Sequence, residues 1–306
     1  MTTGQTPREI SYAFSARSRA GKAIIRSIEN LTGRPRLIRM ALGYEEEVSA
    51  GRDFWEVMTE RYQLKVDVDG IENIPRDGPI IVVANHPYGI LDGMALGRIL
   101  SETRDDFRIV AHKVFHRSEE LSRIILPISF DEDKGARKVN LASRRTALNF
   151  LSSNGAVGIF PGGTVSTSRR PFGDPMDPVW RNFTARLVER SDAVVVPIYF
   201  HGANSRLFQL ASHLHSTLRV ALLIKEFGAR VGDDVRATIG KPVTRAEIEG
   251  VNGDSARLMD ILRDRTYALS PTPLRSYAYG KDWDPVLSER QHPDDDAEKR
   301  RRRRAA

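Results

Sequence analysis

The sequence predicts an α/β protein in which a mixed, largely parallel sheet is flanked by helices and preceded by an amphipathic helical segment. Short apolar runs of strand length alternate along the chain with segments of helical periodicity, which is the pattern of βαβ units. Several of these runs are apolar at nearly every position, as strands buried on both faces of a sheet are. The length of 306 residues is enough for one large domain or two ordinary ones.

Residues 1–63 are predicted to form a basic, helical N-terminal segment. The apolar stripe of a first helix, over residues 16–32, consists of Ile24, Ile25, Ile28 and Leu31. Charged residues such as Lys22 and Arg26 lie off that stripe. A basic amphipathic helix of this kind either lies in a membrane interface or packs on its own domain, and both alternatives are open. A second helix is predicted over residues 45–62.

The main domain is predicted over residues 64–269, where strands and helices alternate. The expected strands are 64–70, 79–84, 107–111, 157–160, 193–200 and 235–239. The expected helices are 93–102, 139–152, 180–190 and 244–268, the last with a break at 250–253. Residues 270–306, rich in Pro, Asp and Arg, are expected to be an irregular tail that ends in the basic run from Lys299 to Arg304.

The charge of the chain predicts a polyanionic partner. The formal net charge is +7, and basic residues far outnumber acidic ones before Gly43. No nucleic-acid reader module or aromatic stacking platform accompanies these charges, so an anionic membrane surface is the predicted partner and nucleic acid is not. No apolar run approaches the length of a spanning helix, and no secretory signal is evident. We therefore expect a cytoplasmic protein, peripheral on the inner face of the cell membrane.

The residue types also exclude several chemistries. The chain has no Cys, which excludes disulfides and thiol nucleophiles. The acidic run from Asp131 to Asp133 is not a calcium loop, because Arg137 and Leu141 occupy later ligand positions. The His residues show no paired metal spacing on a helix, so no metal site is predicted.

Three loops are expected to converge at one edge of the sheet. The segment VANHPYGILDG follows the strand 79–84, a Gly162-Gly163 turn follows 157–160, and the loop from His201 to Asn204 follows 193–200. In α/β sheets ligands bind at the carboxyl ends of strands. In the first loop, Pro87 and Gly89 favour a tight turn that brings Asp92 back to His86, with Asp92 at or near the N-cap of the next helix. The alternative is that Asp92 only caps the helix and His86 is an ordinary loop residue.

Three sequence blocks carry a resemblance to a known family. They are Asn85-His86-Pro87 with Gly89 and Asp92, then Phe160-Pro161-x-Gly163-Thr164-x-Ser166, then Val196-Pro197-Ile198. In this order they resemble the PlsC-like glycerolipid acyltransferases, the lysophosphatidic acid acyltransferase family. The similarity runs from about Gly70 to Pro242 and is greatest to a bacterial branch labelled hemolysin, which also resembles lyso-ornithine lipid acyltransferases. In that branch the His-to-Asp spacing is one residue longer than usual, as it is here.

The resemblance implies the PlsC-like fold and acyl transfer from an acyl-CoA or acyl carrier protein thioester to the hydroxyl of a lyso-lipid. No cofactor is implied beyond this co-substrate. His86 would be the general base and Asp92 the residue that orients it. The second block, Phe160, Pro161, Gly162, Gly163, Thr164 and Ser166, would bind the acceptor, with backbone N–H groups of the 162–164 turn stabilising the oxyanion. Asn85, Gly89, Pro197, His201 and Asn204 would complete the site loops.

The second block departs from the family where the acceptor is bound. Gly162 and Val165 stand where better-known members have a Glu and an Arg associated with the acceptor's glycerol phosphate. Lys113, Arg169 and Arg170, with His112, are candidates to bind an anion instead, and each is otherwise a solvated surface charge. We therefore expect an acceptor without a phosphomonoester, such as a lyso-aminolipid. A non-enzymatic lipid-binding or membrane-perturbing protein on the same fold is the alternative function.

Overall fold

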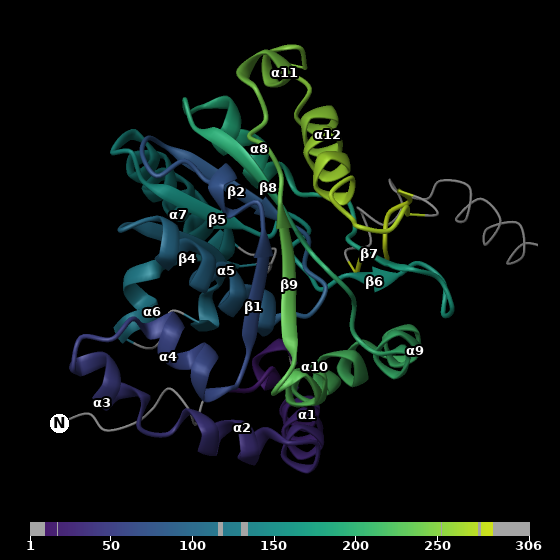
Figure 1. Cartoon of the computed structure of the whole chain (residues 1–306). Coiled ribbons are helices and arrows are strands. Elements are labelled where there is room, and N and C mark those ends of the chain that lie inside the picture. The colour runs from purple at the N-terminus through teal and green to yellow at the C-terminus, as the bar shows by residue number, and fades with distance from the viewer. Residues whose placement is uncertain are drawn as a thin grey trace, which may run out of the picture.

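The protein is described here from a computed structural model, which describes residues 10–16, 18–115, 119–129, 134–251, 253–274 and 277–283. A seven-stranded sheet in the order β1-β9-β8-β2-β5-β3-β4 forms its centre (Figure 1). The strands are β1 (Lys65–Asp69), β2 (Ile80–Ala84), β3 (Phe107–His112), β4 (Ile125–Ile128), β5 (Ala156–Ile159), β8 (Val194–Phe200) and β9 (Asp234–Ile239). All neighbours pair in parallel except β8 and β9. The predicted mixed, largely parallel sheet is therefore confirmed.

Both faces of the sheet are buried because its central strands are apolar at every position. Every residue of β2 is buried. Alternate side chains of β2 enter different clusters, with Ile80 and Val82 on one face and Ile81 and Val83 on the other. The first face is covered by α2 (Arg34–Ala41), α4 (Phe54–Arg61), α5 (Ile90–Thr103) and α10 (Ser216–Arg230). The second is covered by α7 (Lys134–Ser152), α8 (Asn182–Glu189) and α12 (Ser255–Tyr267).

The N-terminal helices differ from the prediction. The helix α1 (Arg19–Leu31) lies beside α10 (Figure 1). It packs there through Ile25 and Ile28, whereas Ile24 and Leu31 are exposed. The predicted helix over 45–62 is wrong as one element, because α3 (Tyr44–Ser49) and α4 are separate. Gly51 ends α3 with φ of 95°, which favours glycine.

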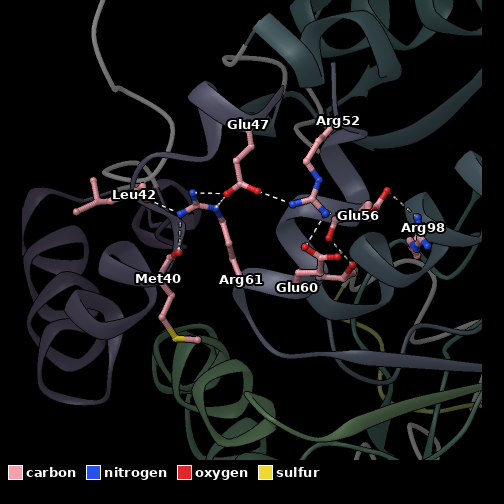
Figure 2. A network of polar contacts seen from close by, with 9 residues as sticks. Met40, Leu42, Glu47, Arg52, Glu56, Glu60, Arg61 and Arg98 are labelled. Carbon is pink, nitrogen blue, oxygen red and sulfur yellow. Dashed lines mark hydrogen bonds and ion pairs between the residues drawn. The ribbon is translucent and has the colours of Figure 1, made fainter. Parts of the chain in front are cut away.

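An ion-pair cluster joins these short helices to α5, where Arg98 lies 3.9 Å from Glu56 of α4. Arg52 lies 2.6 Å from Glu47, 3.0 Å from Glu56 and 2.7 Å from Glu60 (Figure 2). Arg61 lies 2.6 Å from Glu47 and also donates hydrogen bonds to the carbonyls of Met40 and Leu42, at the end of α2. Exposed pairs contribute only about 0–1 kcal/mol each, so the cluster orients the helices more than it stabilises the fold.

Several elements were not predicted. They are α6 (Glu119–Ile124), α9 (Arg206–Leu214), α2, α10, β4 and the two-stranded ribbon of β6 (Thr167–Ser168) and β7 (Pro175–Met176). Three short 3-10 turns, Ala13–Ser15, Ile71–Asn73 and Lys113–Phe115, complete the elements before α6. The predicted helix over 244–268 is broken as expected, into α11 (Arg245–Glu249) and α12. None of the helices that the structure describes is long and apolar enough to cross a membrane.

The described part of the tail packs against the main domain. Residues 277–283 contain no helix or strand, as predicted for the tail. Gly280 donates its N–H to the carbonyl of Asp177 at 2.9 Å, and Lys281 donates to the carbonyl of Thr167 at 3.0 Å. The basic run from Lys299 to Arg304 lies outside the described residues. The divisions at residues 63 and 269 stay predictions.

Two glycines of α5 provide a test of the packing between α4 and α5. A Cβ on Gly97 would lie 2.2–2.5 Å from ring atoms of Trp55, whereas one on Gly93 would meet nothing within 4 Å. Gly97→Ala should therefore lower the free energy of unfolding by about 1–3 kcal/mol, the usual cost of overpacking. Gly93→Ala should match or exceed wild type by up to about 1 kcal/mol, because Ala favours a helix. Urea unfolding measures both, and equal stability of the two variants would contradict the described packing.

Candidate functional site

The site begins where β2 ends, at a loop anchored to β8. The amide of Asn85 accepts a hydrogen bond from the N–H of Phe200 at 2.6 Å and donates to the carbonyl of Phe200 at 2.9 Å. Asn85 is buried, so these two bonds satisfy a side chain that would otherwise be costly to bury. The residue after it, His86, is thereby held at the carboxyl end of the sheet.

His86 and Asp92 form the predicted pair. Nδ1 of His86 lies 2.9 Å from Oδ2 of Asp92. The same oxygen accepts the backbone N–H groups of Tyr88, at 2.8 Å, and Gly89, at 2.9 Å. Asp92 is the third residue of α5 and Gly89 is its N-cap with φ of 100°, so the helix starts earlier than predicted. The loop closes back on itself because Oδ2 of Asp92 contacts both His86, at its start, and the N–H groups of Tyr88 and Gly89, at its end.

Asp92 holds the imidazole in one orientation. The carboxyl group is completely buried, and burial raises its pKa, while His86 and the two backbone donors act in the opposite direction. Because Nδ1 faces the carboxylate, a proton on Nδ1 would leave the lone pair of Nε2 available as a base. The ring of Phe160 stacks on the imidazole at a centroid distance of 4.3 Å and limits its rotation.

Asp177 connects the His86 loop to the second block. Its Oδ1 accepts the backbone N–H of His86 at 3.2 Å and the hydroxyl of Ser166 at 2.5 Å, and its Oδ2 accepts Nε1 of Trp180 at 2.9 Å. Ser166 also donates its N–H to the carbonyl of His86 at 2.8 Å. Asp177 is fully buried, so this carboxylate depends on these donors.

The second block divides between cavity lining and support. Phe160, Gly163 and Thr164 line a large cavity, whereas Pro161, Gly162 and Ser166 are not among its lining residues. A Cβ on Gly162 would lie 3.3 Å from the carboxyl group of Asp177, so Gly162 packs on the support. The N–H of Gly163 donates to the carbonyl of Phe160 within the turn at 3.0 Å. The Gly163 N–H is therefore used within the turn, and its expected role as an oxyanion donor stays a prediction.

The cavity next to His86 is large and mostly apolar. Its volume is about 1160 Å³, slightly above the usual range of about 300–1,000 Å³ for ligand sites. Its walls include side chains of α4 and α5, strands β3 and β4, and the N-terminal residues Tyr12 and Phe14. His86, Thr164 and Arg219 bring polar groups to it. A long aliphatic chain is a suitable occupant of such a space.

The predicted anion-binding residues are not gathered in one place. Lys113 lines the cavity and donates to Ser129 at 3.2 Å, and His112 lines it with its ring stacked on Phe14 at 4.7 Å. Arg169 and Arg170 are not among the lining residues and lie in the turn that connects β6 to β7.

The third loop, from His201 to Asn204, contacts the His86 loop through Tyr88. The carbonyl of His201 accepts the hydroxyl of Tyr88 at 2.6 Å, so the predicted convergence of the loops is confirmed. The His201 ring lies 2.8 Å from the hydroxyl of Thr238 and lines a separate cavity of about 500 Å³. Pro197 is buried within β8, and Asn204 is buried with no partner for its Nδ2 among the described residues. Among the residues that the structure describes, no group of three or more His, Asp or Glu could hold a metal ion.

Two residues of the site were not found from the sequence. Asp177 lies outside every motif block, and Arg219 lies on α10, a helix that was not predicted. The position of Asp177, three residues before Trp180, and the lone Arg219 in the apolar part of α10 were the available cues.

The chain is similar to a known family of enzymes. The chain belongs to the family described as "Acyltransferase", which matches residues 38–273. The protein is therefore an acyltransferase, as the resemblance implied.

Two curated relatives and one solved structure give the relationship in more detail. A "Lyso-glycine lipid O-acyltransferase" of Phocaeicola vulgatus is 29% identical over 63% of this chain and 69% of its own length. A protein of the same name from Bacteroides thetaiotaomicron is 28% identical over 65% of this chain and 73% of its own. The crystal structure of the 1-acyl-sn-glycerophosphate acyltransferase PlsC from Thermotoga maritima covers 84% of this chain and 83% of its own, with a TM-score of 0.46 and 16% identity.

Asp177 can be tested as the support of the His86 loop. Asp177→Asn keeps the size of the side chain but replaces one acceptor oxygen with an NH₂ donor. In one orientation the new NH₂ group faces the Trp180 donor, and in the other it faces the Ser166 and His86 donors. We expect kcat of acyl transfer to fall by about 10- to 100-fold, the effect of slight misplacement of a reacting group. Asp174→Asn, an exposed carboxylate three residues earlier, is the matched control and should behave as wild type. Enzyme assays at a temperature where thermal melts show both variants folded make the measurement, and wild-type kcat in Asp177→Asn would contradict this role.

Proposed function

We propose that this protein moves a fatty acyl group from acyl-CoA or acyl carrier protein to the hydroxyl of a lyso-aminolipid. The observation that carries the proposal is the His86–Asp92 pair, with His86 in the wall of a mostly apolar cavity and 2.9 Å between Nδ1 and Oδ2. Two relatives named lyso-glycine lipid O-acyltransferases support the choice of acceptor. The substitution of Gly162 and Val165 at the places of the family's Glu and Arg supports it from the sequence.

In the proposed reaction His86 acts as general base. Nε2 takes the proton of the acceptor hydroxyl while the hydroxyl oxygen attacks the thioester carbonyl. The tetrahedral intermediate then collapses to an ester, the C–S bond breaks, and the thiolate leaves with the proton returned by His86. Asp92 stabilises the imidazolium that forms between these steps, because its carboxylate lies against Nδ1. The thioester is already an activated acyl donor, so the proposed reaction needs no further cofactor.

The cavity and the N-terminal helix support the choice of lipid substrates. The apolar walls would accommodate the acyl chain beside the reacting groups. On α1 the exposed side chains of Ile24 and Leu31 accompany exposed Lys22 and Arg26. A surface of this composition suits an anionic membrane, from which the acceptor would be drawn. We accordingly propose a peripheral position on the cytoplasmic face of the cell membrane.

Removal of the proposed base tests the mechanism. His86→Ala should lower kcat by at least about 10²–10⁴-fold, the contribution of general acid–base catalysis. The matched control is His201→Ala, because His201 also follows a sheet strand but its ring lines a different cavity. The control should retain activity close to wild type, and membrane-vesicle binding should be unchanged in both variants. Thioester consumption measured with purified protein decides the matter. A wild-type kcat in His86→Ala would overturn the role of His86 as general base.

The acceptor class can be tested on the wild-type protein alone. Offered a lyso-aminolipid and lysophosphatidic acid at equal concentration in mixed micelles, the enzyme should acylate the lyso-aminolipid with the higher kcat/KM. The reason is that no Arg occupies position 165 to hold a phosphomonoester. Product analysis by mass spectrometry measures the two rates in one mixture. A preference for lysophosphatidic acid would overturn the acceptor and leave the acyl transfer intact.

A further inference from the structure

Arg219 is a buried cation in the wall of the cavity that also contains His86. It projects from α10, and only 4% of its surface is exposed. Burial lowers the pKa of the guanidinium to about 10, which still leaves it charged near neutral pH. Burial of a charge is costly unless an opposite charge or several hydrogen bonds compensate it.

The surroundings of Arg219 contain no anion among the described residues. Its Nη2 donates to the hydroxyl of Thr164 at 2.9 Å and to the carbonyl of Val165 at 3.0 Å. Its guanidinium carbon lies 4.9 Å from the ring centroid of Trp283 and 5.5 Å from that of Phe208. Within the described part of the chain, Nε of Arg219 has no hydrogen-bond partner and no carboxylate lies within ion-pair distance.

A second donor near this group is also unused. The indole Nε1 of Trp283 is buried without a partner among the described residues, and the Trp283 ring faces the guanidinium. Two buried donors without acceptors at one place are unusual in a folded protein, because nearly all such groups are paired. Arg219 lines the cavity and Trp283 does not, so a negatively charged ligand oxygen in the cavity would supply the acceptor that the guanidinium lacks.

The position of Arg219 relates it to the reacting groups. It holds the carbonyl of Val165, and the next residue, Ser166, donates its N–H to the carbonyl of His86 at 2.8 Å. Thr164, which Arg219 also contacts, lines the same cavity as His86. A group bound by Arg219 would therefore belong to the same ligand whose hydroxyl reaches His86.

We propose that Arg219 binds the carboxylate of the acceptor's amino acid head group and so determines acceptor specificity, an inference that rests on the proposed function. An amino acid joined to a lipid through its amino group keeps its carboxylate. That planar, singly charged group matches the planar guanidinium fork. Among the described residues the ionisable neighbour of Arg219 is the phenol of Tyr12, and burial raises the pKa of that phenol, so Tyr12 supplies no anion near neutral pH. Nζ of Lys281 lies 4.3 Å from the ring centroid of Trp283, but it donates to the carbonyl of Ser212 at 3.1 Å, and Lys281 is not among the residues that line the cavity. A phosphomonoester, with nearly two negative charges, would call for a second cation in the cavity beside Arg219.

The test compares two acceptors that differ only in this charge. One is a lyso-glycine lipid with its free carboxylate, and the other is the same lipid with a primary amide in place of the carboxylate. Wild type should acylate the carboxylate form with a kcat/KM about 10- to 100-fold higher, the value of a charge-assisted hydrogen bond. In Arg219→Gln this ratio should fall close to one, and in Arg219→Lys it should be partly restored. Each ratio is measured on one preparation, so partial misfolding of a variant cancels.

The controls separate this inference from a structural role and from the proposed function. Arg230→Gln, at the other end of α10 and outside the large cavity, should keep the wild-type ratio. If wild type shows equal kcat/KM for the carboxylate and the amide acceptor, the proposed role of Arg219 is overturned. The proposed function still stands in that case, because both acceptors are acylated. An equal loss for both acceptors in Arg219→Gln would identify a structural role and overturn the inference as well. A wild-type preference for lysophosphatidic acid that Arg219→Gln abolishes would assign the site to phosphate instead.

Discussion

The structure of the site depends on the burial of the Asp92 carboxylate. A single oxygen, Oδ2, faces Nδ1 of His86 and the N–H groups of Tyr88 and Gly89. A buried carboxylate is stable only where such donors surround it, so the folded chain brings the imidazole and the turn to the same point. The tight turn between His86 and Asp92 also requires the positive φ of Gly89. The geometry of the pair is therefore a consequence of satisfying one buried charge.

A second buried carboxylate extends this order to the other loops. Asp177 receives donors from His86, Ser166 and Trp180, while its own carbonyl accepts Nη2 of Arg263 at 3.2 Å and the N–H of Gly280 at 2.9 Å. Segments from four separate parts of the chain thus meet at one residue. Polar clusters of this kind are costly when incomplete, which favours a single arrangement of the loops.

The sequence predicted the parts of this structure that depend on local patterns. The apolar strands such as β2 and β8, the reversal at Gly89 and the approach of Asp92 to His86 follow from periodicity, turn residues and spacing. The role of Asp177 could not be predicted, because it depends on contacts between residues as distant as His86 and Gly280. Arg219 was missed for the same reason, since its burial depends on how α10 packs against the segment around Val165. The prediction of one helix over 45–62 was wrong because Gly51, with its φ of 95°, ends α3 before α4 begins.

The N-terminal segment belongs physically to the site, although the sequence pattern separates it. Tyr12 and Phe14 line the cavity, and they are fixed from α1, where buried Glu29 accepts the N–H of Tyr12 at 2.6 Å and the hydroxyl of Ser11 at 2.5 Å. The same helix presents Ile24 and Leu31 to the outside. One short helix therefore holds a wall of the cavity with one face and offers an apolar, basic surface with the other. Glu29 therefore links the position of α1 to the residues that line the cavity.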